Sequence, residues 1–257
     1  FFFKQKTAYE IVDCDWSSDV CSSDLIIKKS KLSTSVVVMN NNFVTPSALI
    51  VDWGGVLTNG LDHMLTGWTE NENIDLQTYY DVFNKWLGPE AEKELRINPI
   101  HALERGEMTV PDFEKELARA LKNLGNIQVQ EDGLLERMFE FFEHAPDMNG
   151  LVHRARKMGF KTALLSNSWG NSYPRDGWDE LFDEVIISGE VGMRKPDAEI
   201  YLHTLNLLKV KPNEAVFVDD LIHNVHGAKE VGIVGILHTE YEKTKKELEL
   251  IFGVNFD

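Results

Sequence analysis

The sequence predicts an α/β fold in which a doubly wound parallel sheet carries an inserted helical domain. From residue 146 onward, short and nearly continuous apolar strands alternate with amphipathic helices, a pattern typical of a parallel sheet covered on both faces. One further apolar strand, 48–51, comes much earlier, and the stretch from residue 75 to about residue 144 has helical periods without a convincing strand. Several strands end in acidic or small polar residues. An open parallel sheet gathers such ends at one edge, where ligands bind.

The beginning of the chain is set apart from this fold. Residues 4–11 and 15–25 resemble, in that order, the translation of a widely used short-read sequencing adapter and its adjoining primer. We therefore expect residues 1–38 to be a non-native, disordered leader, with Met39 as the true start. A native disordered or targeting leader is the rival interpretation, but its apolar runs are too short for a signal peptide. Both cysteines lie in this leader, so we expect no disulfide, thiol nucleophile or thiolate metal site in the remainder.

The chain is acidic, with 42 Asp and Glu residues, 26 Lys and Arg residues and a formal net charge of −16. An acidic surface argues against a nucleic acid or an anionic membrane as partner. A local cation and a metal can still reverse the field inside a pocket and attract a phosphorylated small molecule. No apolar run approaches the roughly 20 residues of a membrane span. We expect a cytoplasmic monomer or homodimer without nucleic-acid or membrane partners.

Before the inserted domain, the first strand ends on Asp52 and the chain turns on glycines. The α/β core is predicted in two segments, 39–60 and 145–257, on either side of a helical domain over 61–144. Residues 59–74 are polar and rich in Asn and Gly, so we expect a loop at the start of that domain. Thr109 is predicted to cap a helix, because Pro and an acid follow it in the first turn.

Helices and strands alternate after the inserted domain. A second apolar helix is expected over 134–142, and a helix near 148–158 that ends at Gly159 opens the later core. The expected strands that follow are 162–165, 185–187, 215–218 and 233–237, and the expected helices are 197–208, 222–231 and 240–251.

Chemically active residue types stand at the predicted strand ends. These residues are Asp52, the pair Ser166 and Asn167, Ser188, and the pair Asp219 and Asp220. Lys195 precedes Pro196 and Asp197, which open a helix near the same edge. A carboxylate can act as a nucleophile, and Mg²⁺ prefers carboxylate and phosphate oxygens as ligands. A lysine and short donors stabilise the phosphoryl oxygens, so the set suits phosphoryl transfer through an aspartyl phosphate.

The order Asp52, Ser166, Lys195, Asp219-Asp220 resembles the four motifs of the haloacid dehalogenase superfamily of hydrolases. The stretch 188–232 is similar to subfamily I, whose members carry a helical cap between the first and second motifs, as does the phosphatase-like domain of soluble epoxide hydrolases. Residues 101–109 also resemble a recurrent cap segment of that group. The resemblance covers about residues 48–238 and implies a Rossmann-like core with a helical cap.

The resemblance also implies a role for each matching residue in a Mg²⁺-dependent phosphatase that acts on a small phosphorylated substrate. It makes Asp52 the nucleophile and a metal ligand, and it makes the Gly54 carbonyl a second ligand. Ser166 bonds a phosphoryl oxygen with Asn167 beside it, and Lys195 pairs with phosphate and Asp52. Asp220 binds Mg²⁺ directly, and Asp219 does so directly or through water. For Arg194 we favour a substrate contact over a surface position.

One departure from the family pattern is Gly54, because most phosphatases of the family have there an Asp that acts as general acid and base. General acid–base help is worth roughly 10²–10⁴ in rate. The departure predicts a slow enzyme, a substrate with a good leaving group, or an acid from elsewhere, with Asp62 and His63 as the nearest candidates.

Two alternative functions remain open. A metal-free haloacid dehalogenase is one, although the Asp219-Asp220 pair argues against it. A catalytically weak binding or sensor protein is the other, and Gly54 favours it. For the other conspicuous residues we expect structural roles. His223 and His226 are expected on a solvated helix face and not in a metal site. The aromatic residues expected in the core of the cap are Tyr79, Tyr80, Trp86 and Phe113.

Overall fold

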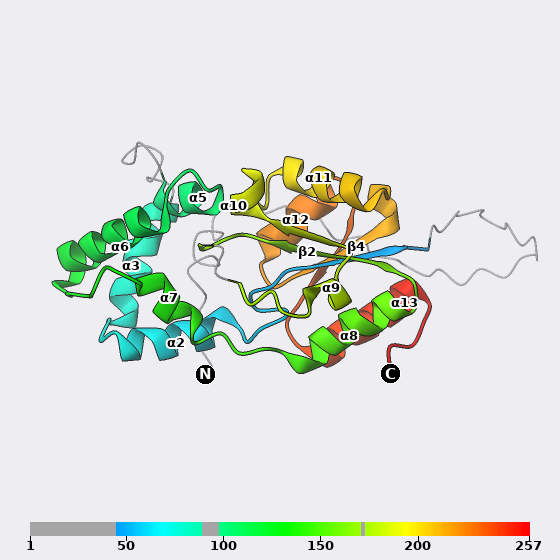
Figure 1. The fold of residues 1–257 in the computed structure, drawn as a ribbon, viewed down its shortest axis with the longest axis horizontal. Coiled ribbons are helices and arrows are strands. Elements are labelled where there is room, and N and C mark those ends of the chain that lie inside the picture. The colour runs from blue at the N-terminus through cyan, green and yellow to red at the C-terminus, as the bar shows by residue number, and fades with distance from the viewer. Residues whose placement is uncertain (1–44, 89–97, 171–172) are drawn as a thin grey trace, which may run out of the picture.

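The computed structural model describes residues 45–88, 98–170 and 173–257, so the predicted leader, with both cysteines, lies outside the described residues. Five parallel strands form one sheet in the order β3-β2-β1-β4-β5 (Figure 1). The strands are β1 (Ala48–Val51), β2 (Lys161–Ser166), β3 (Glu184–Ile187), β4 (Ala215–Asp219) and β5 (Val234–Leu237). The predicted parallel α/β fold is therefore confirmed.

Helices cover both faces of the sheet (Figure 1). One face is covered by α8 (Pro146–Lys157), α9 (Trp178–Leu181) and α13 (Tyr241–Phe252). Leu49 and Val51 of β1 pack in the apolar core on this face. The opposite face is covered by α11 (Ala198–Leu208) and α12 (Ile222–Glu230). Ala48 and Ile50 of β1 pack in the apolar core on that face. All four residues of β1 are fully buried, because side chains alternate between two covered faces.

In the described part of the chain, five further helices lie between β1 and α8 in the sequence and form a separate apolar core beside the sheet (Figure 1). We call them the inserted helices: α2 (Leu61–Asn71), α3 (Leu76–Leu87), α5 (Pro99–Glu104), α6 (Val110–Gly125) and α7 (Leu134–Phe139). Thr109 caps α6 as predicted, since its Oγ1 accepts a hydrogen bond from the Asp112 amide. The predicted core residues Tyr79, Trp86 and Phe113 are buried.

The chain enters and leaves the inserted helices at one place. Thr58 and His144 form an antiparallel bridge, and the Asn59 amide donates to the Glu143 carbonyl at 2.8 Å. The Ala145 amide and the Asn149 side chain both donate to the Leu57 carbonyl. These bonds hold the two connecting segments side by side. The domain boundaries at 60/61 and 144/145 stay a prediction.

Two local expectations are wrong. Residues 59–74 are not a loop, because α2 occupies most of this range. Leu61, Met64, Leu65 and Trp68 have the helical spacing of an apolar face, and the Asn and Gly residues lie mainly at the ends of that stretch. The helix expected over 134–142 ends at Phe139, and two turns of the i→i+3 type continue from it.

Elsewhere in the core, the expected helices and strands agree with the observed ones to within two residues. Short elements, namely α9, α10 (Ser188–Val191) and η1 (Pro212–Glu214), are not predicted, because they are shorter than a sequence period reveals. Among the described residues, no helix has both the length and the apolar character needed to span a bilayer.

Candidate active site

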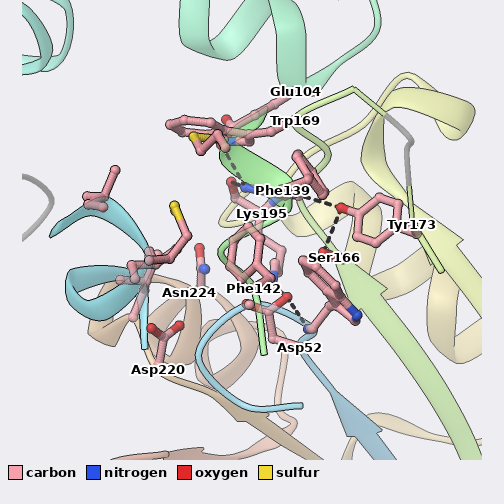
Figure 2. A pocket seen from close by; sticks show the side chains of 18 of the residues that line it. Asp52, Glu104, Phe139, Phe142, Ser166, Trp169, Tyr173, Lys195, Asp220 and Asn224 are labelled. Atoms are coloured by element: carbon pink, nitrogen blue, oxygen red, sulfur yellow. Dashed lines mark hydrogen bonds and ion pairs between the residues drawn. The ribbon is translucent and has the colours of Figure 1, made fainter. Parts of the chain in front are cut away.

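Three strands of the sheet bring acidic and polar side chains to one edge. Val51 of β1 pairs with Leu164 of β2 and Val218 of β4, so Asp52, Ser166 and Asp219 follow at the carboxyl ends. Carboxylate oxygens of Asp52, Asp219 and Asp220 all lie within 4.8 Å of one another. A cavity opens here between the sheet edge and the inserted helices (Figure 2). The predicted site residues that line it are Asp52, Gly54, Ser166, Asn167, Lys195 and Asp220.

Lys195 is the cation of this edge, and its side chain is buried. Its Nζ lies 2.8 Å from Oδ1 of Asp52 and 2.7 Å from Oδ2 of Asp219. Burial lowers the pKa of Lys195, but the charges of Asp219 and Asp52 outweigh it and leave the pKa above its ordinary value. Lys195 therefore stays protonated. The sequence predicted its pairing with Asp52 but not the second carboxylate.

Asp219 and Asp220 are adjacent in sequence but differ in their surroundings. Asp219 accepts hydrogen bonds from Lys195 Nζ and from the Leu221 amide. Asn224 Nδ2 also donates to both carboxylate oxygens of Asp219. Its carboxylate is thus engaged in holding Lys195. In contrast, Oδ1 of Asp220 is buried and has no hydrogen-bond partner within the described parts of the chain. A buried carboxylate oxygen without a donor is costly, so this atom points to an external ligand.

The electrostatics of the edge favour a bound cation. Burial raises the pKa of Asp52 to about 7; Lys195 opposes the rise and Asp219 adds to it. Burial, Asp219 and Asp52 together raise the pKa of Asp220 above its ordinary value. One lysine thus faces three carboxylates, and the residues present fit a hard divalent cation with oxygen ligands.

Ser166 is the last residue of β2, Asn167 follows it, and the two side chains have different partners. Ser166 Oγ lies 3.0 Å from the Tyr173 hydroxyl, and Tyr173 also lines the cavity. Asn167 Oδ1 accepts from the Lys195 amide at 2.8 Å, and its Nδ2 donates to the Lys195 carbonyl at 3.0 Å. The Asn167 side chain therefore fixes the backbone of Lys195. Tyr173 and Asn224 were not predicted, because no local pattern links them to the strand ends.

Arg194 does not line the cavity, although we predicted a substrate contact for it. Its Nε lies 2.6 Å from Oε2 of Glu104 in α5, and both side chains are buried. Ser188 strengthens this junction, since its Oγ donates to the Glu104 carbonyl at 2.5 Å and accepts from the Ser168 amide. The structure thus places Arg194 in a buried link between the core and the inserted helices. The sequence offered no sign of its partner, 90 residues away.

The candidates for a replacement acid lie apart from the cavity. Asp62 and His63 are exposed on α2 and are not lining residues. His223, predicted on a solvated face, does line the cavity, because α12 begins at the sheet edge and its first turn faces inward. His226 is exposed, as predicted.

Apart from Glu104 of α5, the rest of the described cavity lining consists mostly of apolar side chains. We call the charged and polar residues at the sheet edge the floor, and the apolar residues from the inserted helices and the adjoining Phe142 the wall. The wall comprises Leu61, Met64, Leu65, Tyr79, Phe83, Met138, Phe139 and Phe142. Trp53, Trp169 and Tyr173 of the core join floor and wall.

Known proteins resemble this chain in sequence and in fold. The family model of haloacid dehalogenase-like hydrolases matches residues 46–232. Bifunctional epoxide hydrolase 2 of Sus scrofa is 32% identical over 224 residues, which cover 80% of this chain and 39% of that protein. Glyceraldehyde 3-phosphate phosphatase of Methanopyrus kandleri is 35% identical over 104 residues, covering 38% of this chain and 44% of the phosphatase. The chain spans less than half the length of these curated relatives.

Among solved structures, a haloacid dehalogenase family enzyme of Bacteroides thetaiotaomicron in complex with magnesium and inorganic phosphate has a TM-score of 0.52. It is 19% identical, and the match covers 76% of this chain and 94% of that enzyme. This likeness concerns the fold alone.

Proposed function

This chain belongs to the haloacid dehalogenase-like hydrolase family, and from that premise we propose that it is a Mg²⁺-dependent phosphatase. Its proposed substrate is a small phosphorylated metabolite, and the proposed intermediate is an aspartyl phosphate on Asp52. Relatives named as phosphatases support this reaction class.

One observation carries the proposal: Lys195 lies between Asp52 and Asp219 while the buried Oδ1 of Asp220 lacks a partner among the described atoms. The lysine balances part of the negative charge, and the remaining carboxylates suit a divalent cation. Together they form a place where a phosphoryl group can be bound next to a carboxylate nucleophile.

The proposed reaction has two steps. The Trp53 amide and Lys195 both contact Oδ1 of Asp52, so we assign the attack on phosphorus to Oδ2. The bond from phosphorus to the substrate's alcohol oxygen breaks, and the alcohol leaves with a proton from solvent or a side chain. Water then attacks the phosphorus of the aspartyl phosphate, and the bond between phosphorus and Oδ2 breaks. Inorganic phosphate leaves, the proton of the water passes to solvent, and the Asp52 carboxylate is restored. Lys195 and Ser166 bind the phosphoryl oxygens in both steps.

The proposed metal ligands are Asp52, the Gly54 carbonyl and Asp220. Asp219 contributes through the lysine that it holds, or through water. When bound, Mg²⁺ supplies positive charge that offsets the repulsion between the carboxylate and the phosphate. The magnesium and phosphate named for the Bacteroides enzyme are consistent with this assignment.

The proposal extends to the role of the inserted helices, the partners of the protein and its location. The inserted helices would act as a cap that closes over the substrate. The net charge of −16 opposes nucleic-acid and membrane partners. It leaves room for a small phosphorylated substrate, because a bound metal ion together with Lys195 would reverse the negative field inside the pocket. A cytoplasmic location, as a monomer or homodimer, completes the proposal.

Phosphate release from p-nitrophenyl phosphate tests this function. We expect turnover with Mg²⁺ that EDTA abolishes and that fresh Mg²⁺ restores. Halide release from a 2-haloacid without metal would instead identify a dehalogenase. Tight binding of phosphate without turnover of any ester would identify a binding or sensor protein and would refute the proposal.

A further inference from the structure

The wall of the cavity differs from what a sugar phosphate or another polar metabolite would need. Leu61, Met64 and Leu65 of α2 line it together with Met138 and Phe139 of α7. The hydroxyls of a polar substrate lose their water on entering such a site, and each one left without a partner lowers affinity. An apolar group gains from the same transfer, because it leaves water for an apolar surface.

The polar groups that the inserted helices do bring to the cavity offer little compensation. The carboxylate of Glu104 forms an ion pair with Arg194, and its Oε1 lies 3.5 Å from Asn167 Nδ2. Tyr79 is buried against Phe83, with ring centroids 4.3 Å apart. Among the described residues, the lining contributed by the inserted helices is therefore apolar except for these two side chains.

Aromatic rings continue the wall down to the reacting end. Trp53 follows Asp52 directly, and its ring centroid lies 4.7 Å from that of Phe142 and 5.9 Å from that of Phe139. Trp169, which also lines the cavity, stacks on Phe83 with ring centroids 5.6 Å apart. The apolar surface therefore begins beside the nucleophile, where the alcohol part of a bound phosphate ester must lie. Rings fixed by one another give a preformed surface.

We propose that the substrates are phosphate monoesters of apolar alcohols, with the phosphoryl group on the floor and the apolar group against the wall. This inference rests on the proposed phosphatase function and narrows its substrate class. The apolar group could come from an alkyl chain or from an aromatic alcohol, which share this chemistry.

A substrate series with Mg²⁺ tests the proposal. We expect kcat/KM to rise about three- to fourfold for each CH₂ added from ethyl to hexyl phosphate, because each buried CH₂ contributes to binding. Ribose 5-phosphate should be at least about tenfold poorer than hexyl phosphate. A higher kcat/KM for 1-naphthyl phosphate than for decyl phosphate would identify the aromatic source, and the reverse would identify the alkyl chain. Equal or better turnover of ribose 5-phosphate would overturn the inference.

A matched pair of variants separates the wall from general stability. Leu61 and Leu76 each begin a helix, are half-buried and pack on the same apolar core. Of these two leucines, Leu61 lines the cavity and Leu76 does not. Leu61→Gln should lower kcat/KM for hexyl phosphate about tenfold and leave that for ethyl phosphate within about twofold. Leu76→Gln should leave both within about twofold. Equal losses on both substrates, or in both variants, would contradict a role in recognising the apolar group.

A binding measurement keeps this inference separate from the phosphatase proposal. With Mg²⁺ present, calorimetry should show that hexylphosphonate binds at least about tenfold more tightly than methylphosphonate, with a more negative heat-capacity change. Equal affinities would refute the apolar site whether or not the chain turns over esters. Loss of all turnover, with this preference retained, would refute only the catalytic proposal.

Discussion

Lys195 on the cavity floor contacts the carboxylates of Asp52 and Asp219, whereas Leu65 on the wall packs among apolar side chains. The floor places its atoms through directed bonds between strand ends. The wall needs only shape and apolar surface, which many side chains can supply. This difference teaches that substitutions on the floor should change the reaction itself. Substitutions on the wall should change which substrate is accepted, and those at the junction should change stability.

The largest expected effect tests the floor. Asp52→Asn should lower kcat for p-nitrophenyl phosphate by about 10⁴-fold or more, because the amide is a poor nucleophile for phosphorus. Circular dichroism should show a folded protein, since Asn has nearly the shape of Asp.

The matched control for this change is Asp62→Asn, in which an exposed acid outside the described cavity lining is altered. It should keep activity within about twofold. Substantial residual activity in Asp52→Asn, beyond about 1% of wild type, would show that another group acts as the nucleophile.

The next effect tests the junction between core and inserted helices. Glu104→Gln should destabilise the protein by about 3–5 kcal/mol, because it leaves the buried Arg194 guanidinium without its carboxylate. Urea unfolding monitored by tryptophan fluorescence gives the free energy of unfolding.

The contrasting variant, Glu72→Gln, removes an ion pair within the inserted helices. It should cost only about 1 kcal/mol, because Arg137 keeps the carbonyls of Asp132 and Gln130 as acceptors. If the two variants lose equal stability, the Glu104–Arg194 pair has no special role at the junction.

A smaller effect is expected where floor meets wall. An added Cβ at Gly54 would meet only Leu61, at 3.9 Å, so Gly54→Asp should fold normally. If proton donation to the leaving alcohol limits the rate, kcat for alkyl phosphates should rise about tenfold or more. An unchanged kcat would show that another group already supplies the proton, with His223 as the lining candidate.

The neighbouring glycine should respond in the opposite way. Gly55 has a φ of +70°, and an added Cβ would lie 2.3 Å from Oδ2 of Asp220. Gly55→Ala should therefore displace Asp220 and weaken Mg²⁺-dependent activity. Normal activity in this variant would contradict the assignment of Asp220 to the metal.

The smallest predicted effect concerns pH and the junction. Burial, with the positive charges of Arg194, Arg105 and His223, lowers the pKa of His101 to about 4. The folded state then binds fewer protons than the unfolded state between about pH 4 and pH 6.5. His101 therefore removes stability as the pH falls through this window.

Calorimetric melting at pH 7 and pH 5 measures this contribution. Since His101 is partly exposed, we expect it to be near 1 kcal/mol, or roughly 2–4 °C in Tm. His101→Gln should lose that much less on acidification than the wild type. Equal losses in the two proteins would show that other groups set the pH dependence.

Local sequence patterns predicted a large part of the fold and the floor. Continuous apolar runs marked strands buried on both faces, and each run stopped at the residue that the sheet edge presents, such as Asp52 or Ser166. The helical spacing of Leu61, Met64, Leu65 and Trp68 was also present in the sequence, but the flanking Asn and Gly residues hid it.

What the sequence alone determined, therefore, is the order of strands and helices and the residue types at the strand ends, because period and turn chemistry are local properties. Only the tertiary structure decided that Asp219 holds Lys195, that Asn167 fixes the Lys195 backbone, and that Arg194 meets Glu104 instead of the cavity. It also decided that the apolar faces of α2 and α7 line the same cavity as Asp52. These pairings join residues tens of positions apart, and their partners are selected by packing geometry that no local pattern records.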